Sequence, residues 1–97
     1  MIKWIKLKQI CEKLCGYNVN IHLTTELGND IRAFVKKGNQ VDILLNAKYN
    51  KDEEDVIDSI SHELAHVILN STRHGNEFEN KFREIKKEIK KEYYKEE

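Results

Sequence analysis

The sequence carries no net charge and no long hydrophobic run. Its 17 Lys and Arg residues balance 17 Asp and Glu residues, so the chain as a whole is not drawn to nucleic acid or to a membrane surface. No apolar stretch approaches the roughly 20 residues of a transmembrane helix. Lysine alternates with apolar residues near the start of the chain, which does not fit the uninterrupted apolar segment of a signal peptide. We therefore expect neither a nucleic-acid nor a membrane partner, and a cytoplasmic location.

Cysteine, glycine and proline are also scarce, with two, four and none respectively among 97 residues. Cys11 and Cys15 are four residues apart in a predicted helix, a geometry that rarely suits a disulfide. Two cysteines are too few for a second tetrahedral zinc site, so we predict that both are buried thiols. No linker or repeat interrupts the sequence, and we expect residues 1–97 to form a single small domain.

The spacing of apolar residues predicts an α+β fold. The expected elements are a helix over 2–15, strands over 19–24, 31–36 and 41–46, a helix over 50–70 and a last helix from near Gly75. We expect a small three-stranded, largely antiparallel sheet packed on the N-terminal and second helices, followed by the C-terminal helix. Gly16 is suited to end the first helix, and Asn50, with Glu53 three residues later, is the expected N-cap of the second.

The second predicted helix carries His62 and His66, four residues apart, with Glu63 between them. Four-residue spacing places both imidazoles on one face of the helix, where they can bind one metal ion. The apolar residues of the same segment recur on roughly the opposite face, so the histidines are expected to face a cleft or solvent. Glu63 is then placed to accept a proton from water on that metal.

A third histidine, His74, follows His66 by eight residues, just beyond the expected end of the helix. Catalytic zinc sites commonly have three protein ligands and one open position for water. We therefore predict one zinc ion per chain, bound by His62, His66 and His74. The alternative interpretation is a solvated helix face that carries two unrelated histidines.

The motif over 62–66, followed by His74-Gly75-x-x-Phe78, resembles the compact HExxH metallopeptidases of the SprT-like and minigluzincin kind. The resemblance implies a three-stranded sheet over the active-site helix, a zinc ion and hydrolysis of peptide bonds through a metal-bound water. It also implies that Glu63 is the general base and acid. Most relatives in the wider gluzincin group use a glutamate as third ligand, so Glu77 and Glu79 remain alternatives to His74.

Three functional hypotheses follow. The first is a zinc-dependent endopeptidase that acts on a peptide or protein substrate, which would pair with an exposed sheet edge beside the zinc helix. We predict that strand 41–46 is that edge. The alternative is a zinc-stabilised protein-interaction module without catalytic activity, and a third is a metal-dependent hydrolase of another bond. The sequence does not choose among Tyr49, Arg73, Tyr93 and Tyr94 as the oxyanion-stabilising residue.

The C-terminal helix carries one apolar stripe that continues into a mostly charged segment. Its members are Phe78, Phe82, Ile85, Ile89 and Tyr93. A stripe of this length needs a partner surface, which is either the cleft of the same chain or a second copy in a homodimer. In both cases the tyrosines or the terminal carboxylates would cover the zinc and keep the enzyme latent. The alternative is a solvated, frayed end.

Overall fold

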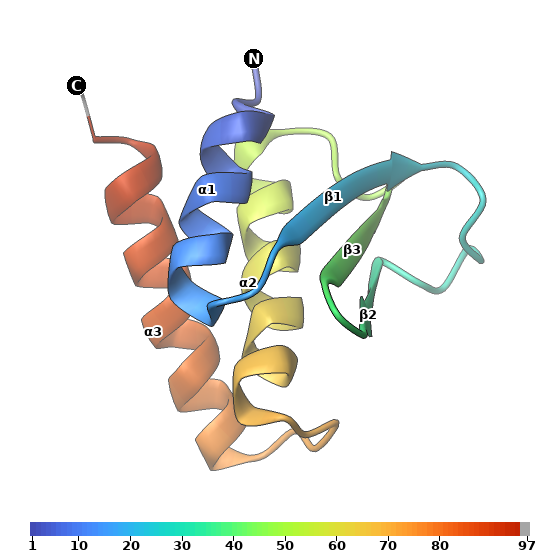
Figure 1. The fold of residues 1–97 in the computed structure, drawn as a ribbon. Coiled ribbons are helices and arrows are strands. Elements are labelled where there is room, and N and C mark those ends of the chain that lie inside the picture. The colour runs from blue at the N-terminus through green and yellow to red at the C-terminus, as the bar shows by residue number, and fades with distance from the viewer. Residues whose placement is uncertain (96–97) are drawn as a thin grey trace.

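The computed structural model describes residues 1–95, which form three helices and three strands. In chain order these are α1 (Trp4–Cys15), β1 (Val19–Thr24), β2 (Ala33–Lys37), β3 (Val41–Asn46), α2 (Glu53–Leu69) and α3 (Asn76–Tyr93). The three helices lie side by side, and the sheet packs against one side of them (Figure 1). The predicted α+β class is confirmed.

The sheet has the strand order β1-β3-β2, with β3 at its centre. β2 and β3 pair antiparallel because a tight turn joins them, whereas residues 25–32 carry the chain past the position of β3, so that β1 and β3 run parallel. One of the two pairings is therefore parallel, and the sheet is mixed rather than largely antiparallel. The prediction that Val41–Asn46 is an edge strand is wrong. This strand is the most apolar of the three, and Val41, Ile43 and Leu45 are fully buried.

Identifiable residues cap α1 and α2 at their ends. The N-cap of α2 is Asp52, whose carboxylate accepts a hydrogen bond from the Asp55 N–H at 2.9 Å. Asn50, the predicted cap, is instead buried and bonded to the strand region. Gly16 ends α1 with a left-handed φ of 78°, as predicted, and Asn70 ends α2 with a φ of 50°. Asparagine tolerates this conformation better than most residues, and it turns the chain sharply at the end of α2.

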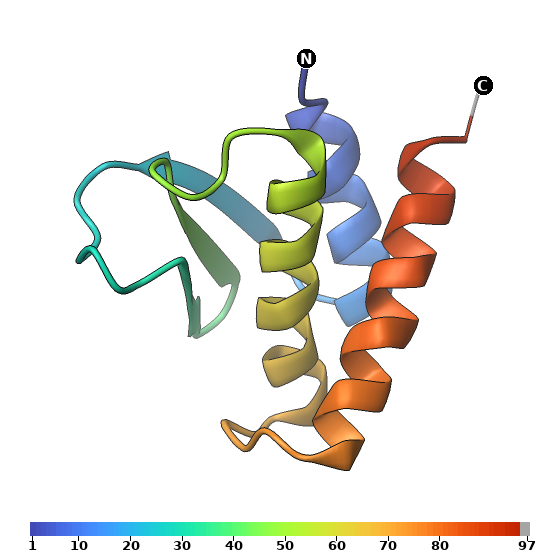
Figure 2. The ribbon, with the colours of Figure 1, turned by 180° about the vertical axis from the view of Figure 1, so that it is seen from behind.

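Helix α3 runs antiparallel to α2 along its length (Figure 2). Four of the five residues of its apolar stripe are buried, namely Phe78, Ile85, Ile89 and Tyr93, and Phe82 is half-buried. They join a core that includes Leu7 and Cys11 of α1. The stripe is thus covered by α1 and α2 of the same chain. Homodimerisation through this helix stays a prediction. The stripe on which that prediction was based is, however, covered within one chain.

Of the two predicted buried thiols, Cys11 is fully buried and Cys15 is half-buried. Burial, together with the nearby Cys15 and Glu12, raises the pKa of the Cys11 thiol to about 12. Within residues 1–95, no helix combines the length and the apolar character needed to cross a membrane.

Candidate metal centre

The structure brings His62, His66 and His74 together at the end of α2. The Nε2 atom of His66 lies 3.3 Å from Nε2 of His62 and 3.1 Å from Nε2 of His74. One ligand nitrogen from each of the three residues lies within 4.8 Å of the other two. His62 and His66 are one turn apart on α2, and His74 comes from the loop that joins α2 to α3.

The loop reaches the histidines because it folds back onto the last turn of α2. After the left-handed Asn70, the Ser71 N–H donates to the His66 carbonyl at 3.1 Å. The Ser71 carbonyl in turn lies 2.9 Å from Nδ1 of the His66 ring. A carbonyl can only accept, so Nδ1 carries the proton and Nε2 of a neutral His66 is left with a free lone pair. The same hydrogen bond fixes the orientation of the ring, as expected for a metal-ligating histidine.

Two of the three separations between these nitrogens match those expected around a tetrahedral zinc ion. Two imidazole nitrogens that each lie about 2.0–2.1 Å from a tetrahedral zinc are about 3.3 Å apart. The separations of 3.3 and 3.1 Å around His66 are close to this value. In addition, the single Nε2 lone pair of His66 accepts only one hydrogen bond along its axis, yet two imidazole nitrogens converge on it. A shared cation accounts for this convergence, and the donor set of three imidazoles suits zinc.

Neither Glu77 nor Glu79 belongs to this cluster in the part of the chain that the structure describes. Both are exposed at the start of α3. The alternative in which a glutamate replaces His74 as third ligand therefore receives no support from the geometry.

Phe78 forms the floor of the cluster. Its ring lies 4.9 Å from the His62 ring, 4.6 Å from the His66 ring and 4.8 Å from the His74 ring, measured between centroids. The side chain is only 2% exposed, so it excludes water from one side of the imidazoles. Burial lowers the pKa of His62, and the charges of His66 and His74 lower it further. Both effects favour the neutral imidazole that a metal ligand requires.

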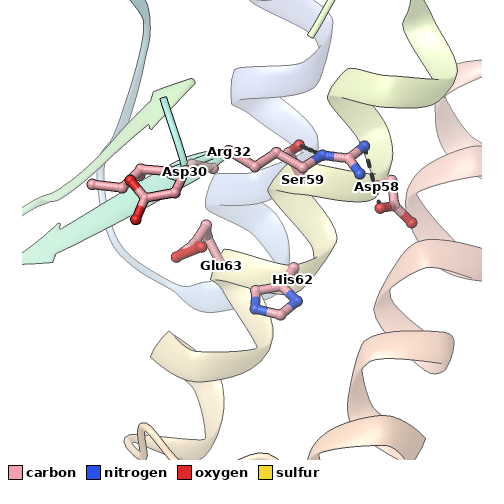
Figure 3. Close-up of a pocket in the computed structure, with 8 residues that line it drawn as sticks. Asp30, Arg32, Asp58, Ser59, His62 and Glu63 are labelled. Atoms are coloured by element: carbon pink, nitrogen blue, oxygen red, sulfur yellow. Dashed lines mark hydrogen bonds and ion pairs between the residues drawn. The ribbon is translucent and has the colours of Figure 1, made fainter. Parts of the chain in front are cut away.

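Glu63 lies beside His62 on the side of α2 that faces the sheet. Glu63 is 8% exposed. Burial raises the pKa of its carboxyl, and the positive charge of His74 partly opposes this effect. Together these two side chains line a cleft of about 370 Å³ between α2 and the segment that leads into β2. Figure 3 shows both side chains below Arg32 in this cleft.

Arg32 spans the top of this first cleft. Its Nε–H donates to the Ser59 hydroxyl at 2.8 Å, and its guanidinium lies 3.4 Å from the Asp58 carboxylate (Figure 3). Ser59 donates in turn to the buried Asn50 side chain at 2.6 Å, and the Asn50 amide donates to the Arg32 carbonyl at 3.0 Å. This closed network holds the segment before β2 against α2, along one side of the cleft.

Sequence reasoning missed this network. Asp55 and Ser59 lie on the same helix as His62 and His66, but Asp55 accepts from the Lys51 N–H and Ser59 bonds to Arg32 and Asn50. The only signal in the sequence is a pair of asparagines, Asn46 and Asn50, placed between a buried strand and a helix. Besides bonds within the turn at 46–50, their side chains bond to partners 9 to 18 residues away, which no local pattern reveals.

A second cleft, of about 430 Å³, lies on the other side of the histidines. It is lined by Val35, Lys37, His66, Val67, Asn70, Ser71, Thr72 and Arg73. The strand β2 borders both clefts, through Ala33 in the first and Val35 in the second. The candidate metal centre therefore has an open cleft on each side, and one strand connects the two.

The C-terminal tyrosines lie far from this centre. Tyr93 donates a hydrogen bond to Glu53, and Tyr94 lies 3.5 Å from the carboxylate of Glu54, both at the opposite end of α2. The predicted covering of the zinc by these tyrosines is therefore not what the structure shows. The terminal carboxylates of Glu96 and Glu97, to which the same prediction applied, lie outside the described residues. Tyr49, another candidate for stabilising an oxyanion, bonds to the Asn29 carbonyl.

Comparison with known proteins gives one match. No curated protein and no solved structure resembles the chain significantly. The sequence profile of the SprT-like family, in contrast, matches residues 5–95, a range that includes the three histidines, Glu63 and all six elements of the fold except the first residue of α1. The chain therefore belongs to the SprT-like family.

Proposed function

We propose that this protein is a zinc-dependent endopeptidase. The observation that carries the proposal is the convergence of three imidazole nitrogens at the end of α2, with a buried carboxylate, Glu63, one residue from the first of them. Membership of the SprT-like family supports the same chemistry. The open clefts on both sides of the centre leave room for a chain that continues in both directions, as an endopeptidase requires.

In this proposal His62, His66 and His74 hold the zinc through their Nε2 atoms. When bound, zinc supplies Lewis acidity, which polarises a carbonyl group and makes water more acidic. The Glu63 carboxylate accepts the proton of the attacking water and passes it to the nitrogen of the leaving amine. Phe78 keeps bulk water away from the back of the imidazoles, and Ser71 keeps the His66 ring in the orientation that presents Nε2.

The strand that pairs with the substrate is β2 in this proposal, because β3 is the centre of the sheet. The Asn46 N–H donates to the Arg32 carbonyl, which places Arg32, and by alternation Phe34 and Lys36, among the residues bonded to β3. The N–H and C=O groups of Ala33 and Val35 then face the open edge. An extended peptide can hydrogen-bond to these groups while it lies across the histidines.

The first test is the zinc content. Elemental analysis of the zinc-loaded protein should give about one zinc per chain, and His74→Ala should lose most of it because two imidazoles leave zinc with too few protein ligands. His22→Ala is the control, since His22 lies exposed on β1 and pairs with Asp42. Wild-type protein that retains no zinc after loading would contradict the proposal.

Glu63→Gln separates an enzyme from a zinc-stabilised interaction module. Glutamine keeps the shape of the side chain but cannot accept the proton, so hydrolysis should fall by about 100-fold or more while zinc content and thermal stability stay near those of the wild type. The measurement is cleavage of a quenched peptide library. If zinc binds at one per chain but the wild type cleaves no peptide, the interaction module becomes the better explanation.

The cytoplasmic location stays a prediction from the sequence. Latency also stays a prediction, and the packing of α3 makes covering of the zinc by Tyr93 or Tyr94 an unsuitable mechanism for it.

A further inference from the structure

The two clefts beside the metal centre differ in charge. Besides His62, the ionisable residues that line the first cleft are Asp30, Arg32, Asp58 and Glu63. Besides His66, those that line the second cleft are Lys37 and Arg73. This difference is local, because the whole chain has no net charge. A substrate that fills both clefts therefore meets fields of opposite sign on the two sides of its reacting bond.

In the first cleft the positive charge is already compensated. Arg32 lies 3.4 Å from Asp58, and Asp58 also accepts from Lys86 at 2.8 Å. Asp30 forms no ion pair with any residue among 1–95. Figure 3 shows the Asp30 carboxylate on the sheet side of the cleft, where the Glu63 carboxylate also lies. The uncompensated charge of this cleft is therefore negative, and Asp30 is its exposed carrier.

In the second cleft both ionisable side chains besides His66 are cationic, and no carboxylate lines the wall. Neither Lys37 nor Arg73 forms an ion pair within the described part of the chain. The ammonium of Lys37 lies 4.8 Å from the centre of the Tyr17 ring, which supports the side chain without neutralising its charge. The uncompensated charge of this cleft is positive.

The direction of β2 relates the two charges to the direction of a substrate. β2 runs from Ala33, which lines the first cleft, to Lys37, which lines the second. Antiparallel pairing is more stable per residue than parallel pairing. A peptide that pairs antiparallel with β2 has its amino-terminal part in the second cleft and its carboxy-terminal part in the first. Its amino-terminal part therefore meets Lys37 and Arg73, and its carboxy-terminal part meets Asp30.

We propose that Asp30, Lys37 and Arg73 select peptides that carry acidic side chains before the scissile bond and basic side chains after it. This inference rests on the proposed endopeptidase function and specifies its substrate class. The three side chains are specificity-determining residues, since they line the clefts and belong neither to the histidine cluster nor to the proton-accepting Glu63. Their exposure lets them exchange water for substrate charges at low cost.

The test uses two fluorescent peptides of identical composition. One places two aspartates before and two lysines after a central block of four uncharged residues, and the other reverses the order. Binding is measured by fluorescence anisotropy on zinc-loaded Glu63→Gln, and cleavage is measured on the wild type. The aspartate-first peptide should bind about three- to tenfold more tightly, as expected for one exposed ion pair on each side. The preference should largely disappear in 1 M NaCl.

The triple variant Asp30→Lys, Lys37→Glu, Arg73→Glu, made in the Glu63→Gln background, inverts both clefts and should reverse the preference. A matched control changes Glu26→Lys, Lys36→Glu and Arg83→Glu, which alters net charge by the same amount. These three residues are exposed and lie outside both clefts, so the control should keep the preference of the parent. Circular dichroism and zinc content verify that both variants fold.

Equal affinity for the two peptides at low salt would overturn the inference, and so would a preference that the triple variant leaves unchanged. A preference for the lysine-first peptide would overturn the antiparallel direction and with it the assignment of acidic and basic sides. These failures leave the proposed function intact if the wild type still cleaves the uncharged peptide library in a zinc-dependent manner. Failure of that cleavage is the separate sign that the proposed function is wrong.

Discussion

The two ends of the α2–α3 pair are held together by different means. At the end formed by Glu53, Glu54 and Asp58, polar side chains connect the helices. Tyr93 donates to Glu53, while Lys90 and Lys86 form ion pairs of 2.9 and 2.8 Å with Glu54 and Asp58. At the other end, between residues 59–70 and 76–85, the described side chains form no hydrogen bond or ion pair across the two helices. That end has apolar packing, the loop and the imidazole cluster.

This difference shows where a metal ion would contribute to stability. His62 and His66 belong to α2, whereas His74 precedes α3, so one zinc ion would connect the two helices at the end that has no other polar connection. The polar end needs no ligand to stay closed. We therefore expect zinc to stabilise one end of the helix pair much more than the other.

The largest expected effect is that of zinc removal. When free zinc exceeds its dissociation constant 1,000-fold, binding stabilises the folded state by about 4 kcal/mol. Chelation should lower the free energy of unfolding by this amount. Amide hydrogen exchange should accelerate most in residues 63–70 and 77–82, and least in residues 53–58 and 86–93. Equal acceleration at both ends would show that the helix pair opens as one unit. Zinc would then stabilise both ends to the same extent.

The next effect tests the polar end through its core. Ile89 is fully buried on α3, and Ile89→Ala should lower the free energy of unfolding by about 3 kcal/mol, measured by urea denaturation. Zinc content should stay at the wild-type value, because the histidines lie on the far side of the pair. As a control, Ile5→Ala removes an exposed side chain, 74% accessible, and should change stability by less than about 0.5 kcal/mol. Loss of zinc in Ile89→Ala would mean that the two ends are coupled.

The sequence was sufficient to predict features that depend on short spacing. His62 and His66 are one turn apart, so a helix alone brings them together, and the stripe of α3 follows the same periodicity. The turn at Gly16 also depends on a single residue. These features need no knowledge of the remaining chain, which is why the fold class and the proximity of His62 to His66 could be predicted.

Features that depend on distant partners could not be predicted in the same way. Both Asn50 and Asp52 have an acidic residue three positions later, so spacing alone could not decide which caps α2. The decision comes from Asn50 being buried against Ser59 and the strand region. Likewise, the central position of β3 depends on its pairing with both neighbours, and the charge of each cleft depends on segments that meet only in the folded chain.

The smallest expected effect concerns one hydroxyl at the polar end. The Tyr93 hydroxyl accepts from the Lys3 N–H at 3.0 Å and donates to Glu53. Tyr93→Phe removes both bonds and should lower the free energy of unfolding by about 1 kcal/mol at pH 8. Tyr94→Phe is the matched control, since Tyr94 is 50% exposed and its contact with Glu54 is long. It should have almost no effect.

The same hydroxyl should give the polar end an alkaline signature that the metal end lacks. Burial and the hydrogen bond to Glu53 raise the pKa of Tyr93 above its ordinary value near 10. The folded state thus favours the neutral phenol, so this contribution is fully present below pH 10 and is lost as the pH rises through the higher folded pKa. The stability difference between wild type and Tyr93→Phe should therefore shrink between pH 8 and pH 11, when measured by urea denaturation. Lysines also titrate in this pH range, but they do so in both proteins. The stability difference between the two proteins therefore reports on the Tyr93 phenol alone. A stability difference that stays constant over this pH range would show that the hydroxyl stabilises the fold by packing and not by its hydrogen bonds. The end of the helix pair at Glu53 would then depend mainly on apolar packing, as the end at the histidines does.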